Sequence, residues 1–189
     1  MSSTVIFDLE TIRLAADMAD DGRPIGWAPE RLHLMGISWG CMWSTATGEV
    51  EHFDEYTFSR LAQALERAAL VVSFNGIKFD VPLLSGYLKR ELTIPRHCDL
   101  LAIIYQSCGK RYSLDDIAAA NLGYGKTGYG GHAPELFRSG RIADLATYCA
   151  RDVGLTRDLF FLAVARGWLY APDSSRILTP VLTGLRSVA

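Results

Sequence analysis

The sequence lacks the features that mark several special classes of protein. Its four cysteines are scattered and include no C-x-x-C pair, so the sequence indicates neither a disulfide framework nor a zinc site. Three of the four stand in apolar contexts, and we expect the cysteines to be buried free thiols of a reducing compartment.

Long hydrophobic runs are also missing. The longest, LFFLAVA from Leu159, is too short to cross a bilayer. No basic segment followed by an apolar stretch stands near Met1, so no secretory signal is expected. The sequence therefore predicts a soluble, cytoplasmic protein that does not interact with a membrane.

No excess of charge of either sign is present. The formal net charge is −2 and 21% of the residues are charged, which does not indicate disorder. A polyanionic partner would have to be held by a local basic patch or by metal ions. Since 49% of the 189 residues are hydrophobic, we expect one domain over 1–189 with a full core. Residues from about 165 to 189 are expected to form a C-terminal arm, whose order the sequence leaves open.

The pattern of apolar residues predicts a mixed α/β domain of three layers. Strands are expected over 4–10, 32–43, 48–53 and 70–75, with 32–53 forming a β-hairpin. A short strand passes into a helix over 97–106. Further helices are expected over 57–70, 79–92, 113–123 and 141–167, and the stretch from 168 to 184 is expected to be irregular. Ser113 and Asp116 form a capping-box pattern, and 123–134 is a glycine-rich loop.

Two acids end the first strand, in the stretch VIFDLETI. Side chains two residues apart in a strand point to the same face, so Asp8 and Glu10 present two carboxylates side by side. These groups repel each other, and burial would increase that cost. A hard cation between them, Mg²⁺ or Mn²⁺, would relieve it, although a solvated strand end is the plainer explanation of this pair taken alone.

Two further segments place acids in apolar surroundings. Asp80 follows a strand and a turn in VVSFNGIKFDVPLL, where a carboxylate at a helix N-terminus is one explanation. Tyr148 and Asp152 lie four residues apart in the longest helical pattern, on one face and next to its apolar stripe. Each segment alone also suits an ordinary helix.

Taken together, the segments FDLET, SFNGIKFD and YCARD resemble the three motifs of the DEDD superfamily of 3′–5′ exonucleases. The resemblance covers about 4–160. Tyr148 stands where the tyrosine branch of these proofreading-type enzymes has its tyrosine, whereas the histidine branch would require a histidine at Thr147. The resemblance implies an RNase H-like fold, with a mixed sheet of about five strands: an antiparallel hairpin, the remainder largely parallel, flanked by helices.

The resemblance also implies the chemistry. Two Mg²⁺ (or Mn²⁺) ions would hydrolyse phosphodiester bonds from the 3′ end of a single strand and release nucleoside 5′-monophosphates. Asp8 would bridge both ions, Glu10 and Asp152 would complete the shell of the first, and Asp80 would hold the second. Tyr148 would position the attacking water or a phosphate oxygen, because a phenol is a poor base at neutral pH.

Four further residues are candidates for substrate contacts: Thr11, Asn75, Phe79 and Lys126. An aromatic ring such as Phe79 can stack on a base, and Lys126 stands in the glycine-rich loop, where a phosphate could approach closely. Structural roles suit them as well, with Asn75 in a turn, Phe79 in the core and Lys126 on the surface. Asp99 is expected to cap a helix.

Other functions fit the same residues. An RNase H-like endonuclease would share the carboxylates, and a catalytically silent nucleic-acid-binding or assembly module would share the fold. DNA is favoured over RNA as the substrate, but no short motif identifies contacts to a 2′-hydroxyl group. A recruiting protein partner, the oligomeric state and the pathway, whether replication, repair or RNA turnover, are left open by the sequence.

Overall fold

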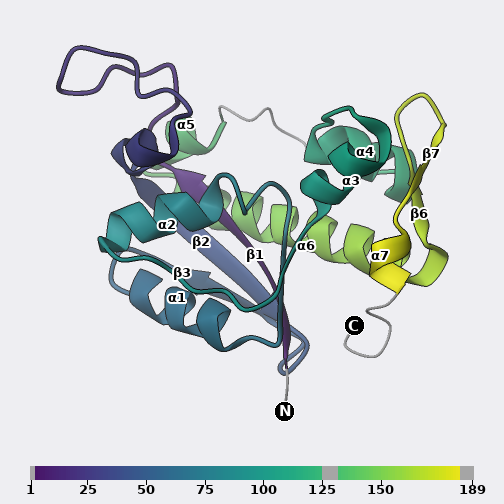
Figure 1. The fold of residues 1–189 in the computed structure, drawn as a ribbon. Helices are drawn as coiled ribbons and strands as arrows, with labels where there is room; N and C mark the ends of the chain where they lie inside the picture. The colour runs from purple at the N-terminus through teal and green to yellow at the C-terminus, as the bar shows by residue number, and fades with distance from the viewer. Residues whose placement is uncertain (1–2, 125–131, 184–189) are drawn as a thin grey trace.

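The computed structural model describes residues 3–124 and 132–183 (Figure 1). The strands are β1 (Thr4–Thr11), β2 (Ile37–Ser44), β3 (Val50–Phe53), β4 (Leu70–Ser73), β5 (His97–Asp99), β6 (Trp168–Tyr170) and β7 (Arg176–Leu178). The α-helices are α1 (Phe58–Arg67), α2 (Asp80–Leu88), α3 (Leu100–Cys108), α4 (Leu114–Leu122), α5 (His132–Arg138), α6 (Ile142–Arg166) and α7 (Pro180–Thr183). A 3₁₀ helix, η1 (Pro29–Met35), precedes β2.

Five strands form the main sheet, in the order β3-β2-β1-β4-β5. The pairs β1–β2 and β2–β3 are antiparallel, whereas β1–β4 and β4–β5 are parallel. This arrangement confirms the expected mixed sheet, with an antiparallel hairpin on one side and parallel strands on the other. The carboxyl ends of β1, β4 and β5 consequently lie at one edge of the sheet, where open α/β sheets bind their ligands.

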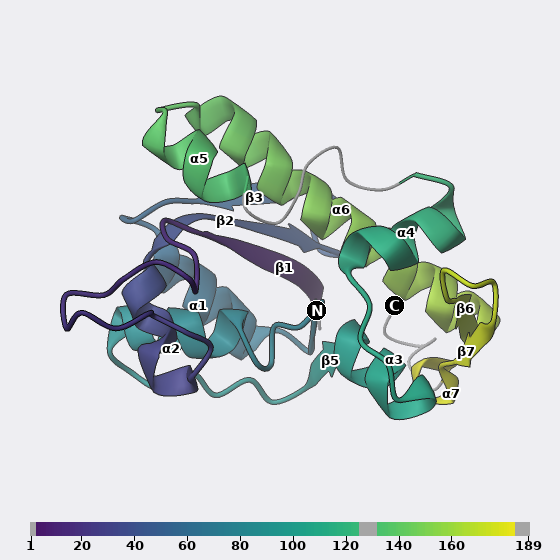
Figure 2. The same cartoon turned by 90° about the horizontal axis from the view of Figure 1, so that it is seen from above.

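Strand β1 is central because both of its faces are covered. Val5, Phe7 and Leu9 join one buried cluster, and Ile6 joins the other. Helices α1 and α2 cover the first face, and the long helix α6 crosses the second, as Figure 2 shows from above. Since successive side chains of a strand alternate, the face that carries Ile6 also carries the two acids at the end of β1, and it faces α6.

Two segments differ from the sequence-based expectation. Residues 32–35, predicted to begin the second strand, belong to η1 because Leu32 and Met35 recur at a spacing of three and are both buried. Gly36, with φ at 65°, separates this helix from β2. In the expected glycine-rich loop, helix α5 begins at His132, and residues 125–131 lie outside the described residues.

The segment after α6 is more regular than expected. Strands β6 and β7 form an antiparallel hairpin, and α7 follows. Leu169, Ile177 and Leu182 are buried in the same cluster as α6. We therefore propose that the C-terminal arm belongs to the same domain as the main sheet.

Helix α6 spans 25 residues. Its buried acid and interspersed charges leave no apolar stretch of membrane length, and none of the helices in 3–124 and 132–183 is both long and apolar enough to span a bilayer.

The close packing of β2 against β1 and α1 generates a prediction. A Cβ added at Gly40 would lie 2.9 Å from Cδ2 of Leu9 and 3.3 Å from Cδ2 of Leu61. Gly40→Ala is therefore expected to lower the free energy of unfolding by about 1–3 kcal/mol, measured by urea denaturation. Gly154→Ala is the matched control, because a Cβ there meets nothing within 4 Å and the helix should gain about 0.5–1 kcal/mol. Equal effects of the two substitutions would contradict this account.

Candidate active site

Within the described residues, a group of possible metal ligands lies at the end of β1. Ligand atoms of Asp8, Glu10 and Cys149 all lie within 4.8 Å of one another. Glu10 is 9% exposed and Asp8 is partly buried. The two carboxylates reach the same face because they alternate with Leu9, and α6 contributes the sulfur. Asp80 and Asp152 are not members of this group.

Cys149 anchors α6 to β1. Its thiol donates to the backbone carbonyl of Asp8 at 3.6 Å, and Cys41, which pairs with Asp8 across the sheet, lies beside it. Burial raises the pKa of Cys149 well above its usual value, and Cys41 and the carboxylates of Asp8 and Glu10 raise it further. The thiol is therefore neutral and separates helix from strand without adding negative charge. Cys41 in turn lies 3.3 Å from Nδ1 of His52.

Asp80 is the first residue of α2 and is 3% exposed. Its Oδ1 accepts a hydrogen bond of 3.1 Å from the backbone N–H of Leu9. Strand β1 pairs with β4 only as far as Ile6, so this carboxylate satisfies a donor that the sheet leaves open. Burial raises the pKa of Asp80 to about 7; the bond from Leu9 opposes the shift and the charge of Asp99 adds to it.

A tight turn between β4 and α2 places Asp80 next to β1. Asn75 adopts φ of 74°, a left-handed conformation that asparagine tolerates better than most residues. At Gly76 an added Cβ would lie 2.6 Å from Cβ of Ser73, so the turn requires glycine. Asp99, 3% exposed, accepts from the backbone N–H groups of Asn75 at 2.9 Å and Ile77 at 3.0 Å.

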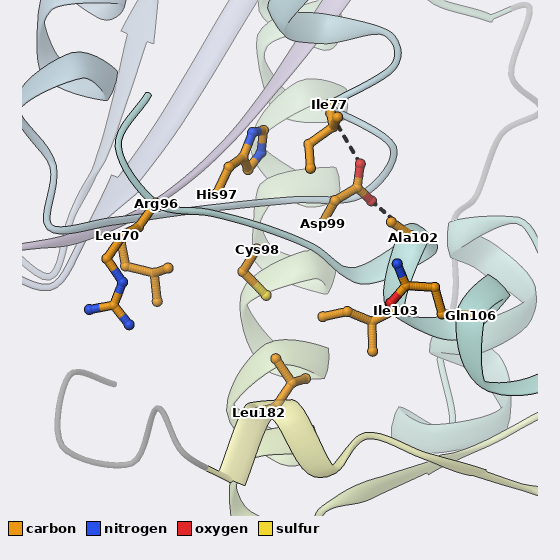
Figure 3. Close-up of a pocket in the computed structure, with 10 residues that line it drawn as sticks. All are labelled: Leu70, Ile77, Arg96, His97, Cys98, Asp99, Ala102, Ile103, Gln106 and Leu182. Carbon is orange, nitrogen blue, oxygen red and sulfur yellow. Dashed lines mark hydrogen bonds between the residues drawn. The ribbon is translucent and has the colours of Figure 1, made fainter. Parts of the chain in front are cut away.

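Asp99 also caps α3, as expected, by accepting from the N–H of Ala102 at 3.2 Å. Its carboxylate thus joins the end of β5, the start of α3 and the turn before Asp80. Figure 3 shows two of these contacts, to Ile77 and Ala102. The sequence indicated the cap but not the contact with the turn.

Tyr148 and Asp152 both lie on α6, one turn apart. Asp152 is 4% exposed, and Cys149, one turn before it, touches Asp8. The Tyr148 ring lies 5.9 Å from the His132 ring of α5, and both line a cavity of about 190 Å³. Helix α5 therefore positions the tyrosine, a role that the sequence did not indicate for His132.

Three of the predicted substrate-binding residues lie together. Thr11, Asn75 and Phe79 line one cavity of about 250 Å³ that also contains Glu10. Trp27, which the sequence did not single out, lines the same cavity, is 71% exposed and lies 5.8 Å from the ring of Phe79. The fourth residue, Lys126, lies outside the described residues.

The donors at this site fit divalent cations. Asp8 and Glu10 offer carboxylate oxygens, the ligands that Mg²⁺ and Mn²⁺ prefer. Asp80 adds a buried carboxylate beside the same strand, bonded to Leu9, and Asp152 is a buried carboxylate on α6 one turn after Cys149. Such a set of buried acids gains most from a cation, because each charge is costly to bury without one.

Fold and site together define an α/β domain with a cluster of acids where central strands end. The chain belongs to the RNase H superfamily, whose family model matches residues 42–159. Membership of this superfamily points to a nuclease that uses divalent metal ions. A comparison with curated proteins gave no match.

Among solved structures, the family B DNA polymerase from the hyperthermophilic archaeon Pyrobaculum calidifontis has the same fold. It is 18% identical to the chain, with a TM-score of 0.63, over 87% of the chain. The match spans only 25% of the polymerase chain, so the likeness concerns one part of a much longer protein.

The raised pKa of Asp80 predicts how stability depends on pH. The folded pKa of about 7 lies above the ordinary value of 3.8. Between these values the folded chain holds a proton that the unfolded chain releases, so the stability of the metal-free protein falls as the pH rises through this window. Asp80→Asn removes the titration and can keep the bond from Leu9. In EDTA at about pH 8 it is expected to be more stable than the wild type, by on the order of 1 kcal/mol.

Thermal unfolding at several pH values measures this difference, which should shrink towards about pH 4. Asp173→Asn is the control, because a hydrogen bond from Ser175 lowers the pKa of that exposed acid, and its amide variant should gain no stability. A variant at Asp80 that is less stable than the wild type at every pH would contradict the prediction.

The three contacts of Asp99 predict a structural cost for its amide. Asp99→Asn leaves one oxygen where two accept, and places an NH₂ group against a backbone donor. The substitution is expected to cost about 2 kcal/mol of stability in urea denaturation, with faster hydrogen exchange at the amides of Asn75 and Ile77. Asp116→Asn, at the exposed capping box of α4, should cost less than about 0.5 kcal/mol. Unchanged exchange at both amides would show that Asp99 does not hold the turn.

Proposed function

We propose that the protein is a metal-dependent 3′–5′ exonuclease of the tyrosine branch of the DEDD superfamily, acting on single-stranded nucleic acid. The observation that carries the proposal is the group formed by Asp8, Glu10 and α6 at the end of β1, with Asp80 bonded to the adjacent Leu9. Membership of the RNase H superfamily supports a nuclease, and the motif order supports the direction of cleavage.

Two Mg²⁺ or Mn²⁺ ions would be held by Asp8, Glu10, Asp80 and Asp152. When bound, such ions activate water and offset charge on the leaving oxygen. Asp8, at the centre of the sheet, would face both ions. Asp80 would release its proton as it takes up its ligand role, because burial keeps that proton on the carboxyl up to about pH 7.

Tyr148 would hold the attacking water or a phosphate oxygen by its hydroxyl group. Its ring is packed beside His132, so the hydroxyl is carried on a side chain held by two helices. Such a group contributes by orientation rather than by removing a proton, since a phenol is mostly protonated near neutral pH.

The terminal nucleotide would lie in the cavity beside Glu10. Phe79 and the exposed Trp27 offer aromatic faces there, and Thr11 and Asn75 offer polar groups. Bases stack on such rings only when they are unpaired, which favours a single strand. DNA is favoured over RNA because the structural relative is a DNA polymerase.

Two other functions make different predictions. An RNase H-like endonuclease would use the same carboxylates, but would have no need of Tyr148 one turn before Asp152. A silent binding module would have no use for Asp8 and Glu10 side by side at the end of β1, or for the buried carboxylates of Asp80 and Asp152.

The test is incubation of the protein with a 5′-labelled oligonucleotide in Mn²⁺ or Mg²⁺. A ladder shortened from the 3′ end is expected, and EDTA should abolish it. Asp8→Ala should abolish cleavage, while Tyr148→Phe should slow it about 10²-fold by loss of positioning. Asp173→Asn, far from the site in sequence and exposed, should cleave like the wild type.

The products distinguish the alternatives. Internal cuts would indicate an endonuclease, and binding without any metal-dependent cleavage would indicate a silent module. Either result would exclude the proposed exonuclease. Comparison of a DNA strand with an RNA strand of the same sequence decides the preferred sugar.

A further inference from the structure

A groove leaves the candidate site along strand β5 and helix α3. It consists of two adjoining cavities of about 450 and 140 Å³, which share Ile77 and Asp99 among their lining residues. The smaller cavity also includes Asn75, which lines the cavity beside Glu10 as well. We call these two cavities the β5–α3 groove. Figure 3 shows the larger one, with Arg96 and Leu182 towards one end and Ile77 towards the other.

The rim of the groove is positively charged. Lys78, Arg96 and Arg111 are exposed and line it, and within the described part of the chain none of the three forms an ion pair. The acid among the described lining residues is Asp99, which is buried and bonded to backbone N–H groups. The positive rim therefore stands out in a chain whose net charge is −2.

The inside of the groove offers apolar and aromatic surface. Tyr105 lines it with half of its surface exposed, and Ile77 is 46% exposed. Leu70, Ile103 and Leu182 line its larger cavity. Cations beside an exposed aromatic ring suit an unpaired strand, whose phosphates can contact the charges while its bases stack on the ring.

Arg111 connects the groove to the site. Its guanidinium donates to Oδ1 of Asn75 at 2.8 Å, and the backbone N–H of Asn75 donates to Asp99. A strand whose end lies beside Glu10 would therefore pass Asn75 before it reaches Lys78 and Tyr105.

We propose that the β5–α3 groove binds the single strand beyond the nucleotide that is being removed. Lys78, Arg96 and Arg111 hold its phosphates, and Tyr105 stacks on a base. This inference rests on the proposed nuclease function, but binding of a strand in the groove can be tested separately from cleavage. The groove makes the enzyme favour strands several nucleotides long over dinucleotides.

The first measurement is binding without metal. Fluorescence anisotropy in EDTA follows a 5′-labelled strand of about 12 nucleotides over a range of salt concentrations. Arg96→Ala and Lys78→Ala should each reduce the slope of log affinity against log salt by about 0.7, the value for one lost phosphate contact on a single strand. Tyr105→Ala should weaken binding about tenfold. The controls are Arg67→Ala and Tyr56→Ala, which remove an exposed cation and an exposed ring outside the groove.

The second measurement is hydrolysis of two substrates in Mn²⁺. The groove variants should raise KM about tenfold for the strand of about 12 nucleotides and leave both kcat and the KM of a dinucleotide unchanged. If the groove variants bind and cleave the long strand like Arg67→Ala, the groove inference is wrong. If the wild type cleaves neither substrate in the presence of metal, the proposed exonuclease function is wrong. The anisotropy measurement would then still show whether the groove binds a single strand.

Discussion

One hydrogen bond, from the backbone N–H of Leu9 to the carboxylate of Asp80, sets the geometry on which the candidate site depends. Parallel pairing of β1 with β4 stops at Ile6, so the strand continues with an unpaired edge directed at the start of α2. A carboxylate placed there fills the open donor and fixes helix against strand. The cost is a buried acid close to other acids, which is why the pKa of Asp80 is raised to about 7. The site is thus assembled under electrostatic strain that a cation would relieve.

Helix α6 packs against the face of β1 opposite to the one that α1 and α2 cover, and the sulfur of Cys149 makes the contact with the strand. Cys149 touches the backbone of Asp8 and lies near the carboxylates of Asp8 and Glu10. A third charged side chain at this depth would add repulsion, whereas a neutral thiol fills the space without charge. Asp152 lies one turn further along α6 and is 4% exposed. Asp99, at the end of β5, holds the turn before Asp80 by accepting hydrogen bonds from two of its backbone N–H groups.

Much of the fold could be predicted from the sequence, because local patterns carry it. The run of apolar residues predicted a strand over 4–10, where the structure has β1, and the Ser113–Asp116 capping box marked the start of α4 as the structure has it. The predicted secondary structure was wrong where a local sequence pattern suited two kinds of element. Leu32 and Met35 suited a strand as well as a 3₁₀ helix, and the segment after α6 contained short strands whose pairing depends on burial against α6 and not on their own sequence.

By itself the sequence determined that Asp8 and Glu10 share a face, since the period of a strand is two, and that Tyr148 and Asp152 share one side of a helix. Only the tertiary structure decided what lies opposite them. Cys149 reaches Asp8 across 141 residues of chain, and its pattern in the sequence is that of an ordinary core residue. The packing of separate elements likewise places Trp27 beside Phe79 and brings Asp99 to the turn before Asp80. It also brings together the cations that line the β5–α3 groove. Such contacts form between residues that are far apart in the sequence when helices and loops pack against a sheet. The periodicity of apolar residues along the chain therefore does not predict them.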